Sequence, residues 1–383
     1  MALNAVRQLR QLNIVRHLST AAPELKYGDA QVRRTQETRA SNHSKSDLYK
    51  FYTLPEEVKS SLFELGGVPK VFKEQSQIFN ESAILVRSCM IELVGYLKQA
   101  DKLDGVPCTR FVVYGEFGVG KSLTLMHALQ YAQENGQLIV HIPWALKWFA
   151  YPKEVSLSTT KEGMVDLNID AAMWLRHFQL QNKKLLEDPK FVISHEYIWS
   201  AREKSEANIP LKELVEHGIS RVKYASDVVD ALFQEIKKLS TQGVCRTFVC
   251  VDGYNCFFTE HSNCRPEDKS KVPPSRVTLT QSVINLVQSD WSNGSIVLGL
   301  SPRANLPDRR ASPLPLYLLK KEGFESIDPF IPIYVPELND EEFHNLLNLY
   351  ESKQWLQLKN VRNEIAFITK QVAQKVYEYC TYK

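Results

Sequence analysis

The chain has 383 residues, of which 44% are apolar and 24% are charged, so it is long enough for two or three domains and can build a sizeable core. Its 16 glycines, its 18 prolines and the lack of a long apolar run exclude a collagen-like chain, wholesale disorder and an integral membrane protein. The net charge of +3 equals the charge of Arg7, Arg10 and Arg16, because 47 basic residues less these three leave 44, which the 44 acidic residues balance. Any contact with nucleic acid must therefore use local basic patches.

The first 18 residues are expected to be a mitochondrial transit peptide. No acidic residue occurs before Glu24, and basic residues alternate with apolar ones as in a basic amphipathic helix. We expect cleavage near Leu18 and import into the mitochondrial matrix. Residues 19–53 are polar and charged without sustained periodicity, which predicts an N-terminal arm that stays extended or disordered until it meets a partner.

Two helices are predicted at the start of the main domain, which we expect to span residues 54–337. The first helix runs from Pro55 to about Leu65, with proline in its first turn and a Gly-Gly pair as its stop signal. The second runs from about Ser82 to Gln99, because its apolar residues cover one broad helical face.

After Pro107, short apolar runs alternate with helical stretches, which is the pattern of a parallel sheet covered on both faces. Five runs are predicted as strands: Phe111–Tyr114, Leu138–Ile142, Thr247–Val251, Ile296–Leu300 and Phe330–Val335. A helical insertion at residues 144–240 separates the second and third strands. It is predicted to contain helices from about Ala171 to Glu187 and from Leu211 to Lys238, and its tryptophans are interpreted as packing residues.

The first strand leads into a phosphate-loop pattern, GxxxxGKS. The predicted nucleotide-binding residues here are Gly115, Glu116, Phe117, Gly118, Val119, Gly120, Lys121, Ser122 and Leu123, and a helix from Ser122 to Gln133 follows. The glycines let backbone N–H groups point at phosphate oxygens, and the helix N-terminus adds partial positive charge. Lys121 is expected to reach the β- and γ-phosphates, and Ser122 to bind Mg²⁺.

The third strand ends in Asp252, which parallel pairing brings to the same edge of the sheet as the phosphate loop. The predicted metal ligands are Ser122 and Asp252, the latter mainly through water. Gly253 follows directly, where vigorous AAA+ ATPases have a glutamate that orients the attacking water. Neither Glu116 nor Glu260 has the spacing to replace it, so we predict nucleotide binding with slow or absent hydrolysis and assign no catalytic residue.

The fourth strand leads into Ser301, which is either a cap or a sensor of the γ-phosphate and is included among the predicted binding residues. The following segment contains Arg303, Arg309 and Arg310, interpreted either as a solvated basic loop or as an RNA-phosphate contact or arginine finger. The guanine-selective NKxD pattern is missing. The expected cofactor is therefore GTP or ATP, or the diphosphate, with Mg²⁺.

Residues 338–383 are predicted to form a C-terminal helical cap. One helix begins at Asp340 and ends near Glu351, and a last helix runs from about Arg362 to Tyr379. A small helical cap behind five parallel strands is the layout of AAA+ and STAND proteins. The predicted fold class is therefore α/β, a P-loop NTPase core with a five-stranded parallel sheet, a helical insertion and this cap.

Further stretches carry a resemblance to a known family. They are Tyr114-Gly115-Glu116, His141-Ile142-Pro143, the run from Val215 to Val222, Val251-Asp252-Gly253, the run from Lys321 to Phe324 and the run from Asp328 to Ile333. With the phosphate loop, they resemble the death-associated protein three family, nucleotide-binding proteins of the mitochondrial ribosome's small subunit. The resemblance extends from about Leu54 to Leu356.

The resemblance implies a place in the head of the small subunit, with contacts to ribosomal RNA, to other mitochondrial ribosomal proteins and to the large subunit across an intersubunit bridge. It also implies GTP binding and a link to apoptosis, although no residue pattern here points to cell death. No membrane contact is expected. Two functions remain open: a structural ribosomal protein with a bound nucleotide that supports mitochondrial translation, and a cycling P-loop NTPase acting as an assembly factor or an apoptotic signalling switch.

Overall fold

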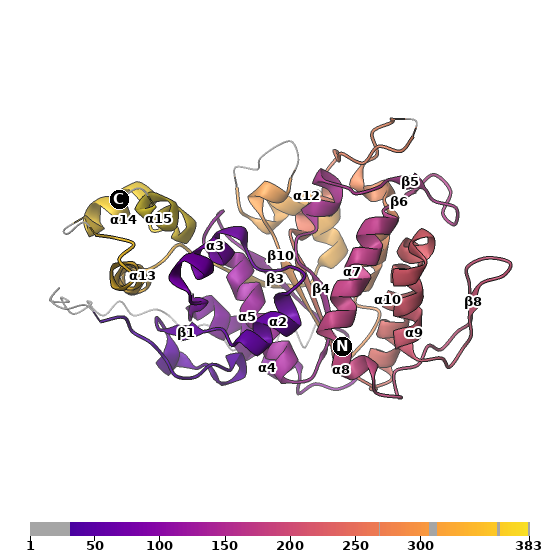
Figure 1. The fold of residues 1–383 in the computed structure, drawn as a ribbon, viewed down its shortest axis with the longest axis horizontal. Coiled ribbons are helices and arrows are strands. Elements are labelled where there is room, and N and C mark those ends of the chain that lie inside the picture. The colour runs from indigo at the N-terminus through magenta and orange to yellow at the C-terminus, as the bar shows by residue number, and fades with distance from the viewer. Residues whose placement is uncertain (1–30, 268, 306–311, 358–360, 382–383) are drawn as a thin grey trace.

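The computed structural model describes residues 31–267, 269–305, 312–357 and 361–381. The expected transit peptide, the first part of the arm, Arg309 and Arg310 lie outside the described residues. Five parallel strands form one sheet in the order β11-β3-β10-β9-β4 (Figure 1). They are β3 (Thr109–Tyr114), β4 (Leu138–Ile142), β9 (Thr247–Asp252), β10 (Gly294–Gly299) and β11 (Ile331–Tyr334). The predicted α/β fold with a five-stranded parallel sheet is confirmed.

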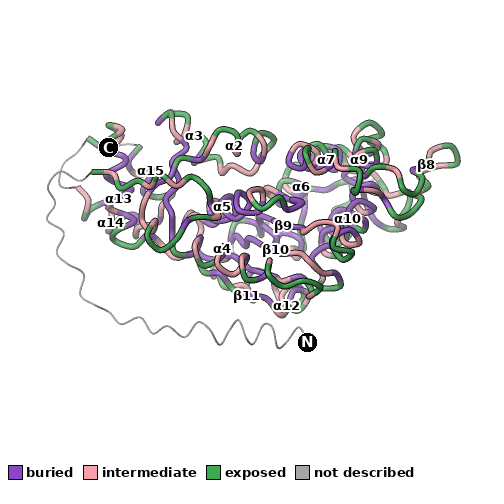
Figure 2. The backbone as a smooth tube through the Cα atoms, turned by 90° about the horizontal axis from the view of Figure 1, so that it is seen from below, coloured by how far each residue is buried: buried purple, intermediate pink, exposed green. Residues whose placement is uncertain are grey.

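Helices cover both faces of this sheet, which explains why its strands are apolar nearly throughout. The covering helices are α4 (Ser88–Ala100) and α5 (Lys121–Glu134) on one face, and α7 (Asn168–Gln181), α10 (Ala225–Thr241), α11 (Thr278–Leu286) and α12 (Pro315–Ile327) on the other. Alternate strand residues point to opposite faces, so Phe111 joins the core under α4 and α5 whereas Val112 joins the other core. Trp148 and Trp174 are buried in that second core. Figure 2 shows β9 and β10 among the buried segments.

The segment between β4 and β9 is a helical insertion. Besides α7 and α10 it contains α6 (Leu146–Ala150), the strand pair β5 (Ser156–Leu157) and β6 (Val165–Asp166), α8 (Lys183–Leu186), the strand pair β7 (Tyr197–Ile198) and β8 (Lys204–Ser205), α9 (Leu211–Ser220) and η3 (Val222–Tyr224). The prediction of one continuous helix from Leu211 to Lys238 is wrong, because Arg221 adopts a non-helical conformation between α9 and α10. The predicted helix from Ala171 to Glu187 likewise divides at Asn182.

Two helices precede the sheet at the N-terminal side. The first, α2 (Glu56–Phe63), matches the predicted helix. The second, α3 (Lys70–Phe79), was not predicted from the sequence. Pro69 precedes α3, and Asn80 ends it in the left-handed conformation, so both ends have recognisable signals.

The predicted helix from Ser82 to Gln99 is wrong in its first turn. Ala83–Leu85 form strand β2, and the helix α4 begins only at Ser88. β2 pairs antiparallel with β1 (Phe51–Thr53). All three residues of β2 are buried, so their continuous apolar character fits a short covered strand as well as a helix.

Residues 31–53 of the predicted arm pack against the domain, so the expectation of an extended or disordered arm is wrong for its described part. Two short turns, η1 (Ala40–Asn42) and η2 (Lys45–Asp47), lie within it. His43 is buried and its ring stacks on that of His127 of α5, with their Nδ1 and Nε2 atoms 2.9 Å apart. Arg33 forms an ion pair with Glu341 of the C-terminal cap. The arm therefore joins the sheet domain to the cap.

The C-terminal cap consists of α13 (Asp340–Ser352), α14 (Arg362–Thr369) and α15 (Ala373–Cys380), which lie together at one end of the molecule (Figure 1). α13 begins with a capping box, in which Asn339 and Glu342 each accept a hydrogen bond from the other's backbone N–H. The prediction of one helix from Arg362 to Tyr379 is wrong, because Lys370 and Gln371 have φ values of 51° and 55°, which break a right-handed helix.

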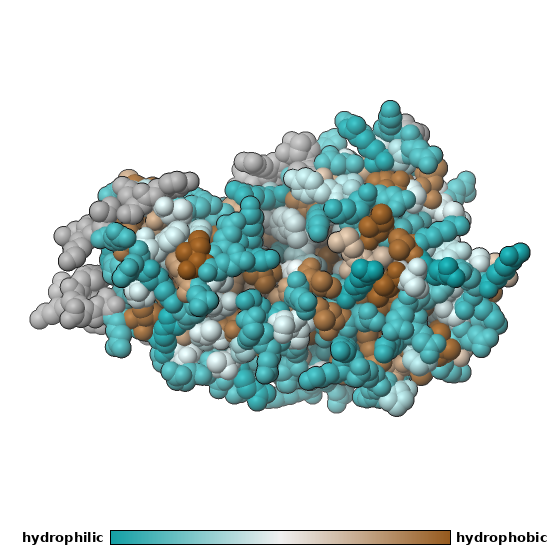
Figure 3. All heavy atoms as spheres, in the orientation of Figure 1, coloured by the Kyte–Doolittle hydropathy of each residue, from teal (hydrophilic) through white to brown (hydrophobic). Residues whose placement is uncertain are grey.

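Apolar side chains reach the surface in small groups separated by hydrophilic ones in the view of Figure 3. On α7, Ile169 and Met173 are 36% and 45% exposed. Scattered apolar residues of this kind are normal on a folded protein. Within the described ranges, we find no helix with the length and apolar character that a membrane crossing requires.

Candidate nucleotide-binding site

The phosphate loop, residues 115–122, connects the end of β3 to the start of α5. Its backbone needs glycine: Gly118 has a φ of 85° and Gly120 a φ of 109°, both in the left-handed region. Gly115 has a φ of 149°, and a Cβ there would lie only 2.3 Å from the carbonyl oxygen of Val335. The spacing of the glycines in the sequence therefore corresponds to a real constraint of the loop.

Lys121 is buried at the base of the loop. Its Nζ donates hydrogen bonds to the carbonyl oxygens of Gly115 at 2.8 Å and Glu116 at 2.5 Å. Burial lowers the pKa of Lys121 to about 8, although the carboxylates of Asp252 and Glu116 act in the opposite direction. A cation held in so little water is suited to an anionic ligand, which would restore the electrostatic stabilisation that water no longer provides.

Asp252 lies beside the loop at the end of β9. The hydroxyl of Ser122 donates a hydrogen bond of 2.6 Å to its carboxylate. Burial raises the pKa of Asp252 to about 6, against the opposing effects of the Ser122 hydrogen bond and the nearby charge of Lys121. The predicted metal ligands are thus brought together, and a hydroxyl with a carboxylate is a donor set that fits Mg²⁺.

The residue after Asp252 is tightly surrounded and has a backbone conformation that favours glycine. Gly253 has a φ of 79°, and a Cβ there would lie 3.2 Å from two ring carbons of Trp144. A glutamate at position 253 would therefore be strained in its backbone and would crowd the indole of Trp144, which follows the end of β4. Glu260, which lacks the spacing to replace the missing glutamate after Asp252, forms an ion pair of 2.7 Å with Lys320.

Ser301 acts as a cap in this structure. Its hydroxyl accepts a hydrogen bond of 3.4 Å from the backbone N–H of Arg303, at the start of η6 (Pro302–Ala304). Asn255, within η4 (Tyr254–Phe258), exchanges two hydrogen bonds of 2.9 Å with the backbone of Ser301. The sequence did not indicate this role for Asn255.

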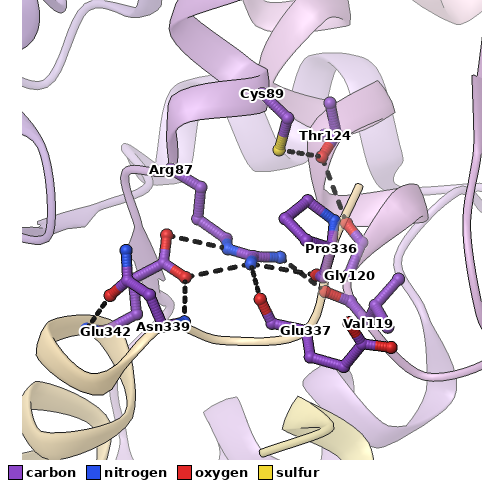
Figure 4. A network of polar contacts seen from close by, with 9 residues as sticks. All are labelled: Arg87, Cys89, Val119, Gly120, Thr124, Pro336, Glu337, Asn339 and Glu342. Carbon is purple, nitrogen blue, oxygen red and sulfur yellow. Dashed lines mark hydrogen bonds and ion pairs between the residues drawn. The ribbon is translucent and has the colours of Figure 1, made fainter. Parts of the chain in front are cut away.

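Arg87 connects the phosphate loop to the C-terminal cap (Figure 4). Its guanidinium donates to the carbonyl oxygen of Val119 in the loop at 2.8 Å and to the carboxylate of Glu342 in α13 at 3.1 and 2.9 Å. It also donates to the carbonyl oxygens of Pro336 and Glu337. Arg87 and Glu342 are only 4% and 2% exposed, so this is a buried ion pair. Sequence reasoning missed it, because an arginine just before a helix carries no motif.

A cavity of about 890 Å³ contains the phosphate loop and extends from it in two directions. The predicted residues that line it are Phe117, Gly118, Val119, Gly120, Lys121, Ser122, Leu123, Asp252 and Ser301. Gly115 and Glu116 are not among its lining residues, and their carbonyl oxygens accept hydrogen bonds from Lys121. One part of the cavity extends towards the cap and is lined by Phe72, Leu346, Tyr350 and Tyr377, among others. The other part of the cavity extends towards α7 and is lined by Trp144, Lys147 and Arg176, among others.

Comparison with known proteins places the chain in a family. Residues 84–378 match the family described as mitochondrial ribosomal death-associated protein 3. The chain is 35% identical over 358 residues to the bovine (Bos taurus) small ribosomal subunit protein mS29, covering 91% of this chain and 89% of that protein. It is 33% identical over 333 residues to the mouse (Mus musculus) protein of the same name, covering 87% and 84%. The chain therefore belongs to the mitochondrial ribosomal death-associated protein 3 family.

Proposed function

We propose that this protein is a structural component of the small subunit of the mitochondrial ribosome, in the matrix, and that it holds a purine nucleotide, GTP or ATP, with Mg²⁺. Its partners there are the small-subunit ribosomal RNA and other mitochondrial ribosomal proteins, with the large subunit reached across an intersubunit bridge. The ribosomal role is supported by family membership and by extended similarity to mammalian small-subunit proteins. The nucleotide role is supported by the phosphate loop.

The observation that carries nucleotide binding is the convergence of Lys121, Ser122 and Asp252 on the wall of an 890 Å³ cavity. The loop amides and Lys121 would bind the phosphates, and Ser122 and Asp252 would hold Mg²⁺, which neutralises phosphate charge when bound. The part of the cavity that extends towards the cap has Tyr350 and Tyr377 on its walls and offers apolar surface for a purine nucleoside.

We further propose that the nucleotide is retained rather than turned over. No carboxylate follows Asp252, a side chain at position 253 would crowd Trp144, and Gly253 has a conformation that glutamate rarely adopts. A nucleotide that binds only the folded chain stabilises it by mass action, which suits a structural role in mitochondrial translation.

Loading the full chain with Mg²⁺ and γ-labelled GTP or ATP tests both statements in one experiment. After free nucleotide is removed, we expect the label to stay with the protein and inorganic phosphate to appear over minutes or longer, because glycine and not glutamate follows Asp252. Retained label and released phosphate are measured over time, and Lys121→Ala serves as the non-binding control. Hydrolysis within seconds that Asp252→Asn abolishes would favour the cycling NTPase, and no retention of either nucleotide would contradict binding.

Magnesium affinity is expected to depend on pH through Asp252. The carboxylate must be deprotonated to bind the metal, and its pKa is raised to about 6, so lowering the pH from 7 to 5 protonates most of it. We expect the affinity for Mg²⁺ at saturating nucleotide to fall about tenfold over this interval. The same Mg²⁺ titration of the variant Asp252→Asn separates this effect from protonation of the nucleotide. An equal pH dependence of Mg²⁺ affinity in the wild-type protein and the variant would contradict the prediction.

A further inference from the structure

Arg303 lies directly against the phosphate loop. Its guanidinium carbon is 3.4 Å from the centre of the Phe117 ring, and both residues line the cavity. A planar guanidinium stacked on an aromatic face keeps the N–H groups along its edge free to donate, which is how arginine recognises phosphate oxygens. Arg303 is therefore a cation beside the tip of the loop, whereas Lys121 is a cation at its base.

The backbone that bears Arg303 is held firmly. Its N–H donates to the Ser301 hydroxyl at 3.4 Å, and Ser301 is fixed in turn by Asn255. The side-chain amide of Asn255, which is fully buried, also donates to Asn305 on the far side of η6 at 2.6 Å. These contacts enclose the turn from both ends, so the direction of Arg303 is set by buried hydrogen bonds and by stacking on Phe117.

Arg303 has no acidic partner among the described residues, although its side chain is exposed to the cavity. By contrast, Lys320 of α12 is neutralised by Glu260 at 2.7 Å. An arginine that is stacked on a phosphate loop and has no counter-ion within the described part of the chain is suited to an anionic ligand.

We infer that Arg303 binds the terminal phosphate of a nucleoside triphosphate and so makes the site prefer triphosphate over diphosphate. This rests on the proposed nucleotide binding and extends it to the phosphate chain length. Lys121 and the loop amides serve the phosphates that both nucleotides share. Arg303 follows β10, which lies between β3 and β9, and its guanidinium lies over the ring of Phe117 in the loop.

The test is the ratio of the dissociation constants for diphosphate and triphosphate, measured at equilibrium on the full chain with Mg²⁺ and the non-hydrolysable β,γ-imido analogues of GTP and ATP. Arg303→Ala is expected to weaken triphosphate binding roughly ten- to hundredfold, which is the effect of losing charge-assisted hydrogen bonds, and to change diphosphate binding less than threefold. Arg303→Lys keeps the charge but loses the flat stack on Phe117, so it is expected to restore only part of the ratio.

Arg176→Ala is the matched control, because Arg176 is an exposed arginine of α7 that lines the same cavity without an ion pair among the described residues. Its loss is expected to change both affinities by the same small factor. Equal weakening of diphosphate and triphosphate by Arg303→Ala, or no change in either, would overturn the inference. Unchanged nucleotide binding with weaker binding of a single-stranded RNA oligonucleotide would assign Arg303 to RNA instead. Wild-type binding of the diphosphate, measured first, tests the proposed function separately.

Discussion

Lys121→Ala is expected to lower nucleotide affinity roughly hundredfold or more, because it removes the buried cation of the phosphate loop. In the wild-type protein the ammonium is already held at the base of the loop by the carbonyl oxygens of Gly115 and Glu116. Burial lowers the pKa of Lys121 to about 8, so the ammonium has lost much of its hydration and a phosphate anion can replace that stabilisation. The measurement is the thermal unfolding temperature with and without Mg²⁺ and nucleotide.

At a nucleotide concentration 100 times the dissociation constant, the wild-type chain should gain about 2.7 kcal/mol in the free energy of unfolding, and the variant almost none. The nucleotide-free variant should still unfold cooperatively, because the change also removes the cost of burying a charge. Lys147→Ala, which removes an exposed lysine from another wall of the cavity, is the control and should retain the gain. An equal gain in wild type and Lys121→Ala would show that any nucleotide binds elsewhere.

The parts of the site that the sequence predicted are those fixed by neighbours in the chain. The run from Gly115 to Ser122 carries its own backbone requirements, and Asp252 ends an apolar strand that parallel pairing brings to the same sheet edge. The five strands were recognisable for the same reason, since burial on both faces leaves short runs of apolar residues. Ser301 lies at the predicted edge of the sheet, but the hydrogen bonds that hold its backbone come from Asn255.

What the sequence could not predict depends on residues far apart in the chain or on local backbone exceptions. Trp144 and Gly253 meet only because β4 and β9 are neighbours, and neither residue carries a motif for that contact. The break between α14 and α15 occurs at Lys370 and Gln371, which are ordinary helix formers in a left-handed conformation. Arg87 and Glu342 are separated by 255 positions, so their pairing required the fold.

Arg87→Ala is expected to lower the free energy of unfolding by about 3–5 kcal/mol, the usual effect of removing one partner from a buried ion pair. The change leaves the Glu342 carboxylate buried without its cation, and it removes the donors to the carbonyl oxygens of Val119, Pro336 and Glu337. Because Val119 belongs to the phosphate loop, nucleotide affinity should fall as well. Chemical denaturation gives the stability, and equilibrium binding gives the affinity.

Glu341→Gln is the matched control, since Glu341 is adjacent on α13 and pairs with Arg33 at 2.7 Å, but both side chains are about half exposed. Its effect should stay below about 1 kcal/mol, as for surface ion pairs generally. The double variant Arg87→Met, Glu342→Gln should cost less than the sum of the single changes, because neither partner is left as an uncompensated buried charge. Additive costs, or a loss confined to stability with unchanged nucleotide affinity, would mean that Arg87 does not couple the cap to the phosphate loop.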